Sequence, residues 1–182
     1  HVVVRKENVD EARAVGFPQV RRVYRSFDPV LHAPVELSDY DVQIWSSEVS
    51  FIGTWFPERG PFMVELLRLG VPLTIRGNRW QYSPEWKKLK HAWKGPGVEK
   101  ENYVKAIQAS KISLGLLSKA NRDLHTTRSA EVPNIGSVFC AERTPEHEWM
   151  FTDGEDAVLW STPAECAERC FELLDNSAKR EQ

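Results

Sequence analysis

Short apolar segments alternate with amphipathic segments along most of this chain. The apolar runs predict strands at residues 49–55, 71–76, 111–116, 137–140 and 157–160. Spacing at three and four residues predicts helices at 58–69 and 100–109, and a capping sequence at 162–165 predicts a final helix. Strands separated by helices favour parallel pairing. We therefore predict an α/β fold, a Rossmann-like parallel sheet with helices on both faces.

The first forty-five residues follow the same pattern less regularly. Strands are predicted at 2–4 and 20–24 around a helix at 7–15, and a further strand at 42–45 follows a polar loop. The chain opens on an apolar strand, whereas termini usually lie in solvent. We therefore expect residues 1–182 to be a single domain cut from a longer protein.

Composition and charge remove several classes of function. Of the 182 residues 41% are hydrophobic, which is enough for a core. The 24 basic and 26 acidic side chains give a net charge of −2 and are interspersed, so we expect no nucleic-acid partner. No apolar run has the length of a membrane span, and no secretory signal opens the chain. We expect a cytoplasmic protein.

The cysteines are few and odd in number. Cys166 and Cys170 stand four residues apart in an amphipathic pattern, where we expect them to pack as small hydrophobic groups. A metal site would need more ligands nearby, and beyond Cys140 only His147 offers one, at a distance along the chain. We predict no bound metal.

The segment from Arg128 to Phe139 carries the strongest functional signal. It predicts a short helix holding Arg128 and Glu131, ended near Gly136 and followed by a buried strand. This order places Glu131 at the mouth of the sheet, where a carboxylate can accept hydrogen bonds from both hydroxyls of a ribose. The alternative is an ordinary surface glutamate on a connecting helix.

A second candidate follows the strand at 49–55. Gly53 and Thr54 come directly after the buried residues, and glycine lets backbone approach a ligand closely. Arg59 lies in the first turn of the next helix, where the helix dipole disfavours a cation and a bound phosphate would reverse that penalty. The alternative is that Glu58 neutralises Arg59 at a solvated helix start.

A third candidate follows the strand at 71–76. Gly77 and Trp80 bring a flexible backbone and an aromatic plane together, which suits a nucleobase or a sugar face. The alternative is a turn whose tryptophan packs on the neighbouring helix. The loop after the strand at 111–116 contains Asp123, eight positions before Glu131.

Competing motifs are weak. The sequence Asp39-Tyr40-Asp41 has the DxD form that carries metal-bound nucleotide sugars, but a three-residue pattern in a polar loop arises often by chance. The chain has no GxGxxG, P-loop, GxSxG or HExxH motif, which removes support from the common redox, nucleotide-hydrolysing, esterase and zinc-protease functions.

Taken in order, the motifs resemble the CgeB-like (spore-maturation) glycosyltransferases. The match runs over nearly the whole chain through FIGT at 51–54 with ER at 58–59, GNRW at 77–80, KISL at 111–114, RSAEVPNIG at 128–136 and FTDGE at 151–155. The resemblance implies the C-terminal, donor-binding half of a two-domain GT-B enzyme. The acceptor-binding half, with any catalytic base, would precede His1, so this chain alone would be inactive.

The resemblance also implies roles for single residues. Arg59 would grip the diphosphate of a nucleotide-sugar donor with help from Arg128, and Glu131 would hold the ribose. Asp123 stands where related enzymes carry a glutamate near the transferred sugar, and its side chain is one methylene shorter. Such enzymes need neither metal nor cofactor beyond the nucleotide sugar. A GT-B epimerase and a non-catalytic module that binds nucleotide, sugar or protein remain alternatives.

Overall fold

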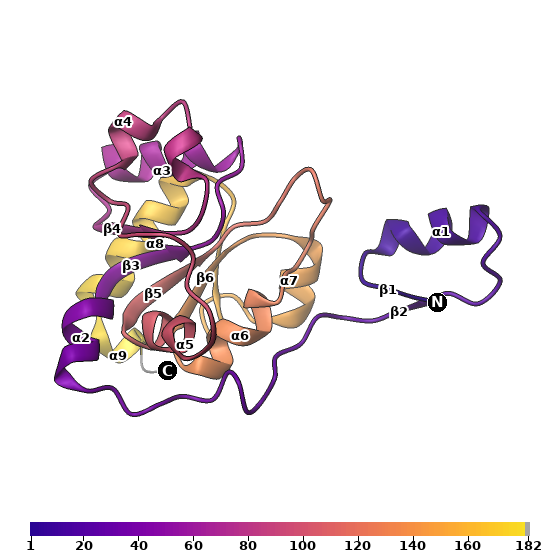
Figure 1. Ribbon diagram of the computed structural model, residues 1–182, viewed down its shortest axis with the longest axis horizontal. Coiled ribbons are helices and arrows are strands. Elements are labelled where there is room, and N and C mark those ends of the chain that lie inside the picture. Colours follow the sequence, from indigo (N-terminus) through magenta and orange to yellow (C-terminus); the bar gives the residue numbers. More distant parts are fainter. Residues whose placement is uncertain (181–182) are drawn as a thin grey trace.

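A sheet of five parallel strands forms the centre of the computed structural model, which describes residues 1–180 (Figure 1). The strand order is β4-β3-β5-β6-β7. The strands are β3 (Ser47–Ile52), β4 (Leu73–Arg76), β5 (Ser110–Gly115), β6 (Val138–Glu142) and β7 (Val158–Trp160). Every pairing in this sheet is parallel, so the predicted α/β class is confirmed.

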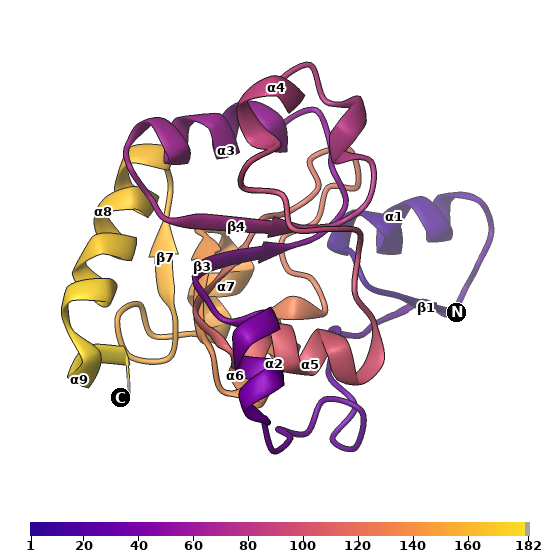
Figure 2. The same cartoon turned by 60° about the vertical axis from the view of Figure 1, so that its left-hand side comes forward.

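Helices cover both faces of the sheet, and Figure 2 shows the layers. One face packs against α3 (Arg59–Arg68), α4 (Trp86–Leu89) and α8 (Pro163–Asp175). The other packs against α5 (Lys100–Gln108) and α6 (Arg128–Ile135). Three short helical segments, η1 (Trp80–Tyr82), α7 (Pro145–Met150) and α9 (Ser177–Arg180), follow β4, β6 and α8. The strands carry apolar residues on both faces because both faces are buried, and the buried hydroxyls of Ser50 and Ser113 hydrogen-bond to each other inside the sheet.

The strand order reverses direction between β3 and β5. The chain leaves β3 for β4 on one side and then returns to place β5 on the other side of β3. The loops after β3 and β5 therefore diverge and leave a crevice at the carboxyl ends of these strands. In open α/β sheets this crevice is the usual ligand site.

Residues 1–25, here called the N-terminal lobe, stand apart from this sheet (Figure 1). In the lobe, β1 (Val2–Val3) pairs in parallel with β2 (Arg21–Arg22), and α1 (Lys6–Ala14) connects them. The two predicted strands form, but they do not join the main sheet. No residue of α1 is buried, and the ion pairs Arg5–Asp123 and Arg22–Glu146 connect the lobe to the loop after β5 and to α7.

The strand predicted at 42–45 is wrong. These residues lie in α2 (Asp39–Trp45), which begins with a capping box between Ser38 and Asp41. Asp41 also pairs with Lys105 at 3.0 Å, which ties α2 to α5. Asp39-Tyr40-Asp41 is therefore a helix start held by contacts within the chain, and its resemblance to a metal-binding motif is coincidental.

Three buried cysteines meet between β6 and α8. The sulfur atoms of Cys140, Cys166 and Cys170, here called the cysteine cluster, lie within 4.8 Å of one another, and no other potential metal ligand of residues 1–180 joins them. Hydrogen bonding with Cys166 and Cys170, together with burial, raises the pKa of the Cys140 thiol. The cysteines pack as small core residues, as predicted for Cys166 and Cys170. Among the described helices none is long and apolar enough to cross a bilayer.

Candidate functional site

Arg59 occupies the crevice between the ends of β3 and β5. Its Nη1 donates to the carbonyl of Thr54 at 2.7 Å, and its Nη2 donates to the carbonyl of Leu116 at 3.0 Å. The guanidinium group also lies 5.3 Å from the ring centre of Phe51 and 4.6 Å from that of Phe56. One buried cation thus connects the two loops that border the crevice.

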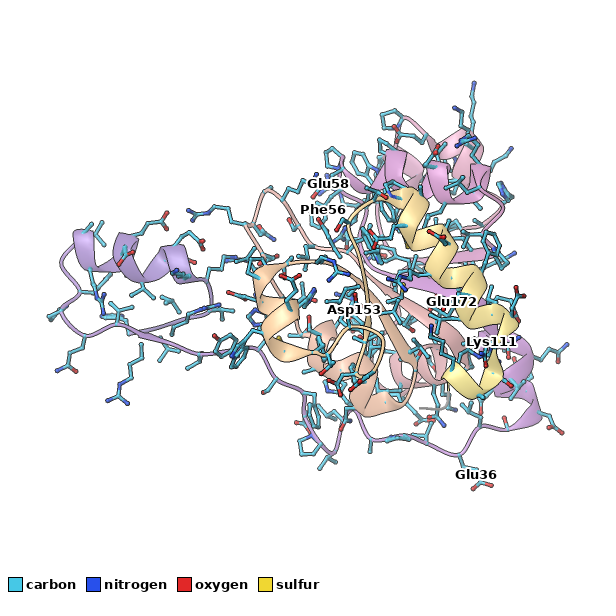
Figure 3. All side chains as sticks on the ribbon, turned by 180° about the vertical axis from the view of Figure 1, so that it is seen from behind. Glu36, Phe56, Glu58, Lys111, Asp153 and Glu172 are labelled. Carbon is cyan, nitrogen blue, oxygen red and sulfur yellow. The ribbon has the colours of Figure 1, made fainter. Side chains whose placement is uncertain are left out.

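The charge of Arg59 lacks a carboxylate partner in the described structure. The side chain is 6% exposed, and burial, reinforced by the positive charge of Arg128, lowers its pKa to about 10. Glu58 does not neutralise it in an ion pair, because the Glu58 carboxylate accepts a hydrogen bond from the backbone of Lys119 at 3.1 Å. Figure 3 shows Phe56 and Glu58 at this end of the sheet, opposite Lys111. The buried charge at the base of the site therefore has no ion-pair partner among residues 1–180, although the charges of Glu58, Asp123 and Glu142 act to raise the pKa of Arg59.

Arg128 adds a second guanidinium group to the same edge. It is the first residue of α6, which begins at the carboxyl ends of the strands because it follows β5 in a parallel sheet. Its positive charge acts to lower the pKa of both Arg59 and Tyr103, so it lies near both side chains. Within residues 1–180 the Nε atoms of Arg59 and Arg128 are buried without a hydrogen-bond partner. Two guanidinium groups with unused donors favour an anionic ligand.

Glu131 lies one turn further along α6. Its Oε2 accepts a hydrogen bond of 2.8 Å from the Tyr103 hydroxyl, and its Oε1 lies 3.8 Å from Nε2 of His32. The side chain is 13% exposed, so the alternative of an ordinary surface glutamate does not describe it. The structure thus brings Arg59, Arg128 and Glu131 to one edge of the sheet, as the strand order requires.

Gly53 and Gly77 bring the loops after β3 and β4 into contact. A β-carbon on Gly77 would lie 1.9 Å from the carbonyl oxygen of Gly53, and Gly77 has a φ of +156°. Only glycine fits this approach. The requirement for glycine at Gly77 therefore comes from the neighbouring backbone and not from a ligand.

Trp80 belongs to the core. It is fully buried, its Nε1 donates to the carbonyl of Gly53 at 2.9 Å, and its ring packs edge-on against Phe51 at 6.0 Å. No face of the indole is exposed to a nucleobase or a sugar. The prediction of a ligand-stacking Trp80 is wrong, and the alternative of a packing tryptophan is confirmed.

Asp123 is engaged by the N-terminal lobe. Nε of Arg5 donates to its carboxylate at 2.8 Å, and the Asp123 side chain is 8% exposed. The adjacent Arg122 pairs with Glu11 of the lobe at 2.7 Å. The carboxylate considered as a catalytic candidate is therefore half of an ion pair between the lobe and the loop after β5.

A buried polar network lies beside this loop and was not predicted from the sequence. The backbone N–H of Arg25 donates to Nε2 of His125 at 3.0 Å, which leaves the ring proton on Nδ1 to donate to Glu146 at 2.5 Å. Arg22 of the lobe pairs with the same carboxylate. The members come from β2, a loop and α7, so no local pattern in the sequence could reveal them.

A cavity of about 340 Å³ opens beside Arg59 at the carboxyl ends of β5, β6 and β7. Its wall includes Phe62, Leu116, Lys119, Glu142 and Trp160. A cavity of about 510 Å³ lies at the opposite edge of the sheet, near Gly136 and Ala157. Arg59 lines the first cavity, whereas neither Arg59 nor Arg128 lines the second.

Comparison with known proteins gives this geometry a family. Residues 59–182 match the family described as glycosyl transferase-like. The chain belongs to the glycosyl transferase-like family. The matched residues include Arg59, Arg128 and Glu131, whereas the loop after β3 precedes the matched region. A comparison of this chain with curated proteins found no match.

Solved structures agree with this assignment. HepE of Anabaena, crystallised with UDP-glucose, superposes with a TM-score of 0.73 at 14% identity, over 99% of this chain and 55% of HepE. Sucrose-phosphate synthase of Thermosynechococcus elongatus gives 0.67 at 13% identity, over 99% of this chain and 50% of that enzyme. The C-terminal domain of LpcC, a glycosyl transferase group 1 family protein of Francisella tularensis, gives 0.60 at 14% identity, over 86% of this chain and 91% of that domain.

These similarities establish the fold of this glycosyl transferase-like chain as that of a GT-B glycosyltransferase domain. The chain spans about half the length of HepE and of sucrose-phosphate synthase.

Proposed function

We propose that this chain is the donor-binding half of a CgeB-like (spore-maturation) glycosyltransferase and binds a nucleoside-diphosphate sugar. The single observation that carries the proposal is the convergence of Arg59, Arg128 and Glu131 at the crevice of the sheet. A diphosphate needs concentrated positive charge, and a ribose needs a fixed acceptor of hydrogen bonds. The crystal structures of HepE in complex with UDP-glucose and with UDP support a donor of this class.

In this proposal Arg59 and Arg128 bind the diphosphate and Glu131 binds the ribose hydroxyls. The backbone at Gly53 and Thr54 borders the phosphates, because it directly follows the carboxyl end of β3. Cleavage of the bond between sugar and diphosphate places negative charge on the departing nucleotide. The two guanidinium groups stabilise this charge as it develops. Since they already supply the positive charge, we expect no requirement for a metal ion or a cofactor.

The acceptor half is expected in the remainder of a longer protein. HepE and sucrose-phosphate synthase are about twice the length of this chain. We therefore expect this chain to bind the donor without transferring its sugar. A cytoplasmic location suits a nucleotide-sugar donor.

A non-catalytic donor-binding module is the second candidate. The observation that favours it is the Arg5–Asp123 ion pair, because it occupies the carboxylate that stands nearest to a catalytic position. A GT-B epimerase would share the same donor site. Analysis of the products of a longer protein separates transfer, epimerisation and binding alone.

Calorimetric titration with UDP, GDP, ADP, dTDP and their glucose conjugates, in EDTA, tests the proposal. We expect saturable binding of one nucleotide that is weakened at least about tenfold in Arg128→Met, as for a lost charge-assisted contact to phosphate. Arg68→Met is the matched control, because Arg68 is 66% exposed and pairs only with Glu65 on the surface of α3. Equal affinity in Arg128→Met and the parent, or binding of none of these nucleotides, would contradict the proposal.

A further inference from the structure

We infer that Tyr103 and His32 are positioning residues that hold the carboxylate of Glu131 for the hydroxyls of a ribose. This inference rests on the function proposed above and deepens it. Neither residue belongs to the motifs that point to a donor site. Tyr103 comes from α5, and His32 comes from the segment that joins the N-terminal lobe to α2.

Tyr103 holds one oxygen of the carboxylate. Its hydroxyl donates to Oε2 of Glu131 at 2.8 Å, and the residue is buried. Burial raises the pKa of Tyr103 far above its ordinary value, so the hydroxyl keeps its proton and remains a donor. An ionised carboxylate offers about four acceptor positions. Tyr103 uses one of them, which fixes the orientation of the group and leaves Oε1 for a ligand.

His32 borders the other oxygen. The backbone N–H of Asp28 donates to Nδ1 of His32 at 3.0 Å, so the ring proton of the neutral imidazole lies on Nε2. Nε2 lies 3.8 Å from Oε1 of Glu131, which is too long for a hydrogen bond. The proton on Nε2 of His32 therefore attracts Oε1 electrostatically and leaves the acceptor positions of Oε1 free. A hydroxyl group can still donate to this oxygen.

The position of His32 is itself fixed by the helix that carries Glu131. Nδ2 of Asn134 donates to the carbonyl oxygen of His32 at 2.7 Å. The His32 ring also packs edge-on against Tyr103, with ring centres 6.2 Å apart. Asn134 and Glu131 are three residues apart on α6, so they share one face of the helix. Both positioning residues thus contact the element that presents the carboxylate.

This arrangement makes a selective prediction about ligands. Two vicinal hydroxyls bind more tightly to a carboxylate that is already held in one orientation, because binding then costs no entropy to order the carboxylate. A nucleotide without these hydroxyls gains nothing from it. Loss of the Tyr103 hydroxyl should therefore weaken binding of a ribonucleotide and leave binding of its 2′,3′-dideoxy counterpart unchanged.

The experiment uses whichever of UDP, GDP and ADP binds the parent chain most tightly, together with its 2′,3′-dideoxy form. For Tyr103→Phe we expect an affinity loss of about 3- to 10-fold for the ribonucleotide, the range for one hydrogen bond, and no loss for the dideoxy nucleotide. Tyr82→Phe is the matched control, since Tyr82 is exposed on the surface. Thermal melting establishes that each variant is folded.

His32→Ala provides an independent variant, with His91→Ala as its control because His91 is exposed near α4. The same selective loss is expected in His32→Ala, and this variant decides the question if Tyr103→Phe does not fold. Equal losses for both nucleotides, or no loss, overturn the inference while the proposed donor site stands. A parent chain that binds both nucleotides equally, or neither, overturns the ribose assignment of Glu131 and the inference together.

Discussion

Replacement of Arg59 by methionine separates the two roles that the structure gives to this side chain. Arg59 bridges the carbonyls of Thr54 and Leu116, and it also forms the base of the proposed diphosphate site. Methionine keeps the unbranched aliphatic part of the side chain and removes the charge. The variant should lose nucleotide affinity and still fold.

The expected magnitude follows from two opposing terms. Leaving two carbonyls without their donor costs about 1–3 kcal/mol each. Against this, the lowering of the Arg59 pKa from 12.5 to about 10 shows that its charged form is poorly solvated, by about 3 kcal/mol at 1.36 kcal/mol per pKa unit. Removing the charge recovers that amount. The two carbonyls together cost about 2–6 kcal/mol, so the net effect on the unfolding free energy should lie between a gain of about 1 kcal/mol and a loss of about 3 kcal/mol.

Binding has no such compensation. A charge-assisted hydrogen bond contributes about 1.5–3 kcal/mol, so the loss of one phosphate contact should lower the affinity for the nucleotide at least about tenfold. Urea unfolding and calorimetry of the same samples measure the two quantities. Arg68→Met should change neither, because exposed ion pairs contribute about 0–1 kcal/mol. A folded Arg59→Met variant with parental affinity, or a stability loss beyond about 4 kcal/mol, would refute the reasoning.

Three further predictions concern the scaffold. Gly77→Ala should lower the unfolding free energy by more than about 3 kcal/mol, because the new β-carbon meets the backbone of Gly53, and an unchanged urea midpoint would argue against this contact. The cysteine cluster should not react with a thiol reagent in the native protein and should react fully in denaturant; rapid native labelling would contradict its burial. Burial lowers the pKa of His147 from 6.5, so below pH 6.5 the folded state binds fewer protons than the unfolded state and stability falls as pH falls. The free energy of unfolding should therefore change less between pH 5 and 8 in His147→Gln than in the parent. An identical dependence on pH in the two proteins would refute this.

The site contains both predictable and unpredictable parts. Arg59, Arg128 and Glu131 could be placed together from the sequence because each follows a predicted parallel strand, and such strands end at one edge of the sheet. Trp80 could not be assigned, since the same local sequence suits a ligand platform or a core residue. Its burial under the loop of Gly53 settled the matter.

Two local predictions failed for physical reasons. The apolar residues at 42–45 suit a strand, but the capping box at Ser38 and the ion pair of Asp41 with Lys105 stabilise a helix there. The strands of the N-terminal lobe pair with each other and not with the main sheet, and ion pairs such as Arg5–Asp123 and Arg22–Glu146 fix the lobe beside the loop after β5 and α7. In both cases a contact outside the predicted segment decided its structure or its place.

The sequence by itself determined the α/β class, the parallel sheet and the edge at which ligands would bind. These follow from periodicity and chain order, because a strand buried on both faces is apolar throughout and a helix on the sheet is amphipathic. Only the tertiary structure decided the partners of the polar groups. Asp123 meets Arg5 across 118 residues, and Glu131 meets Tyr103 and His32 from two separate segments. A hydrogen bond or an ion pair depends on distances of a few ångströms, and the spacing of residues along the chain does not specify them.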